Sequence, residues 1–154
     1  MGIFGFFKSA PFADPVLGTL RRSGGRWKGT VSFGPHTDVA LRVIGDKTPD
    51  PVALTLARDL PARFEELRGP IETALFEHHE PYRESGVADA LPRFAHAADV
   101  WPHVTPVFVS VEPLAGSPTR GPILEIAYRV AWDEEHTVAA RVQDWRVFEL
   151  CGSV

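Results

Sequence analysis

The last third of the chain, from Thr105 to Val154, most constrains the fold, because it reads as four consecutive β-strands with short connections. Between Pro122 and Trp132, apolar residues occupy every second position and Glu125 and Arg129 fall between them. This two-residue period is typical of a strand with one buried face. The expected strands span residues 106–112, 122–132, 137–142 and 145–150, and strands joined this closely pair mostly antiparallel.

The first half of the chain predicts three more strands, at residues 16–22, 26–33 and 38–44. The sequence Ser23-Gly24-Gly25 between the first two is a hairpin signal. In the second strand, apolar side chains alternate with polar ones, so we expect it to be half buried.

A helical segment is expected after these strands. Asp50 is a favourable N-cap residue, Pro51 occupies the favoured first position, and apolar residues keep helical spacing over residues 60–78. Pro61 and Pro70 interrupt this run, and a proline in a helix interior costs about 3 kcal/mol. We therefore expect a kink or a break near each of the two prolines.

Together these elements predict an α+β fold, a mostly antiparallel, twisted sheet of six or seven strands with the kinked helical segment packed on one face. Residues 1–15 read as an apolar N-terminal tail, and residues 16–154 as a single α+β domain. The tail contains Phe4, Phe6 and Phe7, which we expect to dock on the domain. Contact of these rings with a membrane is the less favoured interpretation.

Charge and cysteine content exclude several classes of function. The net charge is −4, with +4 in residues 1–48 and −8 in residues 49–154. An acidic chain without a dense basic face argues against nucleic-acid binding. Cys151 is the single cysteine, so neither an intrachain disulfide nor a cysteine-based zinc site can form, and we expect a cytoplasmic protein.

The sequence carries no phosphate-binding loop and no nucleophile motif, and we assign no catalytic residue, metal ligand or cofactor from it. One candidate metal site is His96, Asp99 and His103, which would share a face of a helix and match a two-histidine, one-carboxylate ligand set. Pro102 argues against a helix that continues to His103. The run Glu77-His78-His79-Glu80 also resembles a set of metal ligands, but helical neighbours point about 100° apart. Histidines that complement the dipole at a helix C-terminus are the favoured interpretation of this run.

A candidate binding surface combines aromatic and polar residues: Trp101, Asp133, Glu134, Glu135, His136 and Trp145. We expect Asp133–His136 at a turn between two strands, where polar residues are also favoured for their solvation alone. Trp101 falls in an irregular stretch and Trp145 opens an edge-like strand, so exposure would let either contact a partner.

Three short motifs carry a resemblance to a known family. D-P-V-x-G at Asp14–Gly18, W-x-G at Trp27–Gly29 and W-D-x-E-H at Trp132–His136 resemble an uncharacterised bacterial domain family of unknown function. The resemblance covers nearly the whole chain and implies N-terminal strands, a helical segment and a closing hairpin. Some similar small domains look like immunity proteins encoded beside polymorphic toxins, which block a toxin by binding it.

We therefore expect an uncharacterised, non-enzymatic binding protein, immunity-like in that it binds another protein. The acidic segment 49–154 suits a basic partner. The alternative is a small metal-dependent enzyme that uses the cluster of His96, Asp99 and His103 or the turn carboxylates. The sequence also allows a homodimer in which edge strands of two copies pair.

Overall fold

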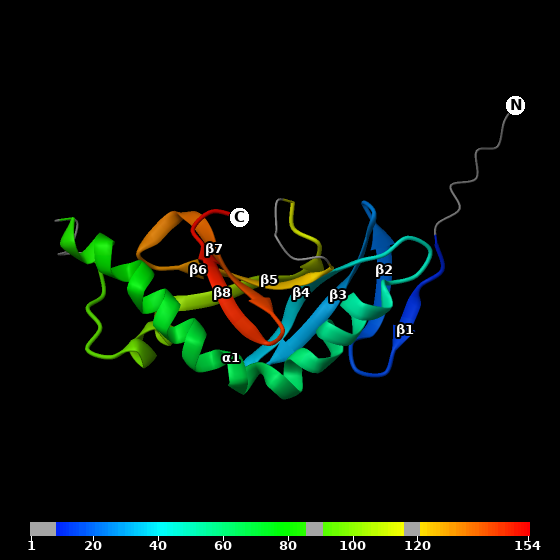
Figure 1. The fold of residues 1–154 in the computed structure, drawn as a ribbon, viewed down its shortest axis with the longest axis horizontal. Helices are drawn as coiled ribbons and strands as arrows, with labels where there is room; N and C mark the ends of the chain where they lie inside the picture. Colours follow the sequence, from blue (N-terminus) through cyan, green and yellow to red (C-terminus); the bar gives the residue numbers. More distant parts are fainter. Residues whose placement is uncertain (1–8, 86–90, 116–120) are drawn as a thin grey trace, which may run out of the picture.

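A computed structural model describes residues 9–85, 91–115 and 121–154 of the chain. In this part it shows one open sheet of eight strands, which lie side by side in chain order, and one long helix (Figure 1). The strands are β1 Phe12–Asp14, β2 Gly18–Ser23, β3 Arg26–Phe33, β4 His36–Ile44, β5 Val104–Glu112, β6 Ile123–Val130, β7 Asp133–Gln143 and β8 Arg146–Cys151. The long helix is α1 Pro51–Glu84, and a short 3₁₀ helix, η1 Ala97–His103, precedes β5.

All neighbouring strands pair antiparallel except β4 and β5, which are parallel. The chain passes through α1 and η1 between these two strands, and a parallel pair requires such a long connection. The expected α+β class with a mostly antiparallel sheet is confirmed. The expected number of six or seven strands is too low, because the described residues form eight. The additional strand is β1, whose three residues are too short to show an alternating pattern. Phe4, Phe6 and Phe7 lie outside the described residues.

Helix α1 is continuous over 34 residues, so the kink or break that we expected near Pro61 and Pro70 is wrong. Its interior prolines, Pro61, Pro70 and Pro81, are all exposed. The helix curves along the sheet in Figure 1, and the hydrogen bonds on the solvent side of a curved helix are already the longest. The prolines therefore remove hydrogen bonds where water can replace them.

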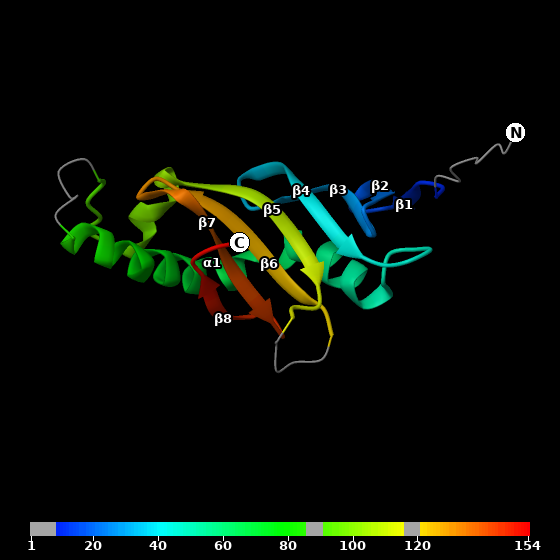
Figure 2. The same cartoon turned by 90° about the horizontal axis from the view of Figure 1, so that it is seen from above.

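One face of α1 covers one face of the sheet. Its buried residues recur at three- and four-residue spacing, and they are Ala53, Leu54, Ala57, Leu60, Phe64, Leu67, Ile71, Leu75 and His79. The helix contacts β3, β4, β5, β6 and β8, and Figure 2 shows it running beneath these strands. The expected cap is confirmed, because the Asp50 side chain accepts a 2.9 Å hydrogen bond from the Ala53 N–H.

On the sheet face that α1 covers, apolar residues of neighbouring strands pair with one another. One row across five strands consists of Trp27, Val43, Val111, Leu124 and Val142, all of them buried. Because successive side chains of a strand point to opposite faces, the residues between these positions lie on the face without α1. The fold therefore has one covered face and one face that no helix of the described residues covers.

A buried carboxylate joins the first strands to the start of α1. Asp14 accepts hydrogen bonds of 2.9 Å from the N–H groups of Val16 and Leu17, and it forms an ion pair with Arg58 of α1. Burial opposes ionisation of Asp14, but the bonds from Leu17, Val16 and Arg58 outweigh it and lower its pKa. Asp14 is therefore an ionised group that orients the β1–β2 turn against the helix.

We predict that Asp14→Ala lowers the free energy of unfolding by about 1–3 kcal/mol, because it leaves two N–H groups and a guanidinium without their acceptor. Chemical denaturation measures this loss. Asp46→Ala is the matched control, since Asp46 also pairs with an arginine, Arg22, but its side chain is 86% exposed. Its effect should stay within about 0.5 kcal/mol, and equal losses for the two variants would contradict the assigned role.

Candidate functional site

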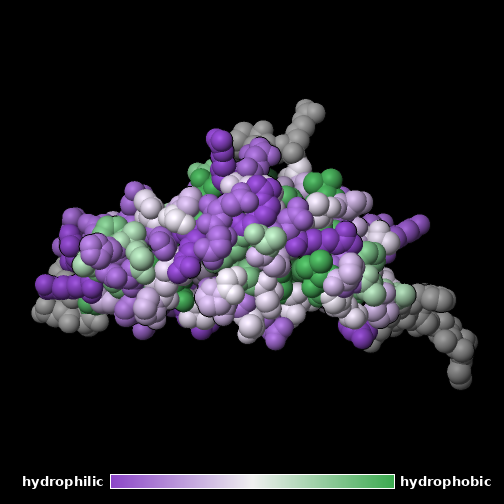
Figure 3. Space-filling model, turned by 90° about the horizontal axis from the view of Figure 1, so that it is seen from below, coloured by the Kyte–Doolittle hydropathy of each residue, from purple (hydrophilic) through white to green (hydrophobic). Residues whose placement is uncertain are grey.

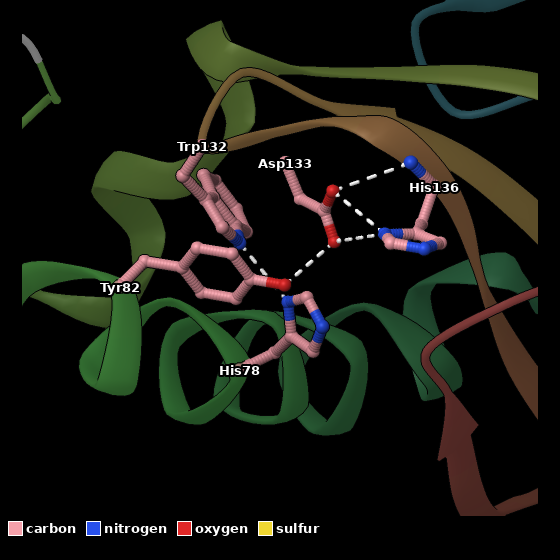
Figure 4. A network of polar contacts seen from close by, with 5 residues as sticks. All are labelled: His78, Tyr82, Trp132, Asp133 and His136. Atoms are coloured by element: carbon pink, nitrogen blue, oxygen red, sulfur yellow. Dashed lines mark hydrogen bonds and ion pairs between the residues drawn. The ribbon is translucent and has the colours of Figure 1, made fainter. Parts of the chain in front are cut away.

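A network of polar side chains connects the end of α1 to the hairpin of β6 and β7 (Figure 4). The Tyr82 hydroxyl donates to Asp133 Oδ2 at 2.6 Å, and His136 Nδ1 lies 3.0 Å from Asp133 Oδ1. The His136 N–H donates to the same carboxylate at 3.2 Å. Asp133 is only 7% exposed, so a buried carboxylate is held by three hydrogen-bonding groups from a helix and a strand.

The local chain path differs from the expected one. We expected a turn at Asp133–His136, but the turn consists of Ala131 and Trp132, and β7 already begins at Asp133. Trp132 is 3% exposed, because its ring packs against His79 and Phe94. The turn comes earlier in the chain than expected because Trp132 and Asp133 are buried against α1. When β7 starts at Asp133, both side chains reach the helix.

The second hydrogen bond between α1 and the hairpin fixes the tautomer of His78. Trp132 Nε1 lies 3.0 Å from His78 Nδ1. An indole N–H only donates, so His78 Nδ1 accepts and the neutral ring carries its proton on Nε2. Burial lowers the pKa of His78, although the nearby Asp133 opposes this effect. His78 is therefore a neutral N–H donor at pH 7.

The same contacts shift the pKa values of Asp133 and Tyr82. Burial alone would raise the pKa of Asp133, but hydrogen bonds from Tyr82 and His136 lower it below its usual value. The hydrogen bond to Asp133 raises the pKa of Tyr82. When His136 donates from Nδ1 to Asp133, its Nε2 is left as an acceptor on a side chain that is 48% exposed. A carboxylate that orients a histidine in this way is found in general bases, and also in purely structural networks.

The neighbouring residue His79 has a different partner. It is 1% exposed, its Nε2 lies 2.9 Å from the Pro92 carbonyl oxygen, and its ring packs on Phe94. A carbonyl only accepts, so Nε2 donates. Since His78 contacts Trp132 and His79 contacts Pro92, the two adjacent histidines of Glu77–Glu80 are directed to different segments.

The structure does not bring His96, Asp99 and His103 together as a ligand set. Asp99 Oδ2 accepts hydrogen bonds from the N–H groups of Ala95 and His96, at 3.0 and 2.9 Å, and so caps η1. The ring of His103 packs against Phe94. Across residues 9–85, 91–115 and 121–154, no group of three His, Cys, Asp or Glu side chains has a geometry that could hold a metal ion.

The expected binding surface is divided between separate places. Trp101 is half buried, donates from Nε1 to Glu72, and packs against Phe64. Trp145 lies in the β7–β8 turn with a φ of +58°, and Arg63 stacks over its ring at 4.3 Å. Asp133 is the first and Gln143 the last of the 11 residues of β7, so this turn lies about 33 Å from Asp133 at 3.3 Å per residue. Of the six residues, only Asp133, Glu134, Glu135 and His136 are neighbours.

A groove of about 700 Å³ lies next to the network, between α1 and β8. The helix contributes residues from Pro70 to His78 that share one face, and the strand contributes Val147–Leu150. Strand β8 pairs with β7 on one side and has no partner strand on its other side among the described residues. Val147 pairs with Val142 and Glu149 with Arg141, so Phe148 is the extra residue of a β-bulge and is 48% exposed.

The surrounding surface is polar. Figure 3, which views the molecule from the side of α1, shows mainly hydrophilic residues with small, separate hydrophobic areas. Phe148 is therefore one of few large apolar side chains that are exposed in the described residues.

Among these residues, no helix is long and apolar enough to cross a membrane.

Sequence reasoning missed the roles of Tyr82 and His78. Their four-residue separation places two polar aromatic rings on one side of a helix end, with centroids 5.4 Å apart, and this spacing was a usable signal. Their partners Trp132 and Asp133 lie about 50 residues further along the chain, and no local pattern indicates such a contact.

We predict that Tyr82→Phe lowers the free energy of unfolding by about 1.5–3 kcal/mol, because it removes a hydrogen bond to a buried carboxylate and keeps the ring. Chemical denaturation at pH 7 gives the value. A loss below about 0.5 kcal/mol would show that the bond between Tyr82 and Asp133 contributes little to the fold.

We also predict that the free energy of unfolding decreases as the pH is lowered from 7 to 5, in part because of His78. Its pKa is lower in the folded protein than the ordinary value of 6.5, so the unfolded chain binds more protons below that value. His36, whose pKa is lowered by burial and by Arg68, acts in the same direction. In His78→Gln, where an amide oxygen can still accept from Trp132, the fall should be smaller, as measured by thermal unfolding at both pH values. The exposed His96 provides the control, His96→Gln, and an equal change in both variants would contradict the role of His78.

One of three comparisons with known proteins matches the chain. A search of curated proteins found no match to the chain, and a search of solved structures found none either. A family model described as a domain of unknown function, DUF6985, matches residues 16–153, a range that includes β2–β8, α1 and the complete network of Figure 4. The chain therefore belongs to the DUF6985 family of domains of unknown function.

Proposed function

We propose that the protein is a non-enzymatic binding protein that holds an extended segment of another protein in the groove between α1 and β8. The observation that carries the proposal is the exposed Phe148 on an edge strand beside this groove. An edge strand offers unpaired backbone groups to an incoming strand, and the groove offers contacts to its side chains. Phe148 supplies the apolar contact that such a segment would cover.

The use of the polar side chains supports binding over catalysis. Asp14 pairs with Arg58 of α1 and Asp133 accepts from Tyr82 of α1, so each joins two elements, and Asp99 caps η1. His79 is buried and bonded to a carbonyl, and His78 accepts from an indole. Groups that the sequence offered for acid–base or metal chemistry therefore have structural partners.

The charge around the groove favours a basic partner. Glu77 lines it from α1 and is exposed, whereas Glu149, which lines it from β8, is paired with Arg141. Glu134 and Glu135 are exposed at the start of β7. Complementary charges mainly raise the rate and the specificity of association. A basic toxin blocked by a bound inhibitor fits this chemistry, so the immunity-like function is our specific proposal.

The proposal predicts that a partner captured by the tagged protein from its native host is lost when Phe148 is changed to Asp. A charge in the apolar contact should lower the recovered partner at least tenfold, because burying an unpaired carboxylate is costly. Quantitative mass spectrometry of the eluates measures this recovery, and high salt should also reduce it.

Val52→Asp is the matched control, because Val52 is 60% exposed and lies in the first turn of α1 away from the groove. Circular dichroism establishes that both variants are folded. Recovery that is lost with Phe148→Asp and kept with Val52→Asp supports the groove. Equal recovery with both variants, or no specific partner for the wild-type protein at either salt, counts against the proposal.

A further inference from the structure

The sheet face opposite α1 carries three positive side chains in one row. Arg21 on β2 pairs with Lys28 on β3, and Lys28 pairs with Arg42 on β4. Directly opposed residues of antiparallel strands point to the same face and lie about 5 Å apart. Trp27 is buried on the side of α1, so its neighbour Lys28, and with it the whole row, lies on the uncovered face.

The same row continues across the sheet with a different balance of charge. From Arg42 it passes through Ser110 to Glu125, Arg141 and Glu149. Here Arg141 lies between two carboxylates, with ion-pair distances of 2.9 Å to Glu125 and 3.0 Å to Glu149. In the β6–β8 half of the row, each charge is therefore paired with an opposite charge of the same molecule, with a net charge of −1.

The β2–β4 half has no such neutralisation. Among the described residues, no carboxylate oxygen lies within 4.0 Å of the charged groups of Arg21, Lys28 or Arg42. Arg21 and Lys28 are exposed, and the Arg42 guanidinium lies flat over the Phe108 ring at 3.9 Å. Like charges directly opposite each other destabilise a sheet. Arg42 gains its contact with Phe108, but the repulsion among the three charges opposes folding, and an anion from outside the chain would relieve it.

We propose that the outer face of β2–β4, defined by Arg21, Lys28 and Arg42, binds an acidic α-helical segment of a partner protein. Three cations on adjacent strands span about 10 Å at 4.8 Å per strand. Carboxylates at positions i, i+4 and i+7 of a helix span about 10.5 Å, whereas alternate residues of an extended strand span about 13 Å. The spacing of the row therefore matches a helix.

Two further features favour an acidic protein segment. The stacking of Arg42 on Phe108 restricts its side chain before binding, so less conformational entropy is lost in the complex. The net charge of −4 opposes the long-range attraction on which nucleic-acid binding depends, whereas a short acidic helix needs only local contacts. This surface is separate from the groove between α1 and β8, and the proposal needs no partner there.

The test uses a labelled synthetic helical peptide with glutamates at i, i+4 and i+7 on one face, titrated with the full-length protein at low salt and followed by fluorescence anisotropy. Lys28→Glu should weaken binding at least tenfold. The same variant should raise Tm by a few degrees, because a carboxylate between Arg21 and Arg42 produces the alternating charges found at Arg141. Loss of binding in a protein that has become more stable cannot arise from misfolding.

The control variant is Arg93→Glu, which makes the same change in net charge at an exposed position before η1 and should alter binding less than twofold. A peptide with the same composition but glutamates on all sides should bind at least fivefold more weakly. Equal weakening by the two variants, equal binding of the two peptides, or no binding by the wild-type protein would overturn the proposal. Tighter binding of single-stranded oligothymidine than of the peptide would overturn it in favour of a nucleic acid.

Discussion

The structure depends on the packing of one helix against one face of an eight-stranded sheet. At 1.5 Å per residue the 34 residues of α1 extend about 51 Å, whereas eight strands at 4.8 Å spacing extend about 34 Å. The helix is therefore long enough to cross the whole sheet and to extend past it. Its single apolar stripe buries one face, and the other face must be compatible with water. This asymmetry explains why apolar rows alternate with rows of charged and small residues through β2–β8.

Near its two ends, α1 is joined to the ends of two strands by buried carboxylates. Asp14 connects the β1–β2 turn to Arg58, and Asp133 connects the β6–β7 hairpin to Tyr82. These aspartates belong to the D-P-V-x-G and W-D-x-E-H motifs, so the motifs that carried the family resemblance have structural roles in this chain. A polar cluster of this kind resembles a catalytic site in sequence, because both require ionisable groups in close contact.

Sequence patterns predicted the elements whose signals are local. The alternation around Tyr128 predicted β6, and Asp50 with Pro51 predicted the start of α1. The continuous helix was missed because the cost of Pro61 and Pro70 depends on which side of the helix they occupy, and that is a property of the packed structure. Trp145 was placed in a strand, yet it lies in the turn with a positive φ, a conformation that is unfavourable for a bulky residue and is not indicated by its sequence. The groove and the charged row depend on contacts between distant strands, which no local pattern shows.

The functional account combines these constraints. Asp14, Asp99, His78 and His79 make hydrogen bonds within the fold. The binding that we propose uses instead an exposed phenylalanine on an edge strand and uncompensated cations on an open face. Hydrogen–deuterium exchange of the protein, free and bound to its captured partner, tests this account most directly. We expect slower exchange on binding in β8 and in residues 70–78 of α1, the two sides of the groove. Protection confined to other segments, such as η1 and the β6–β7 turn, would contradict the proposed binding mode.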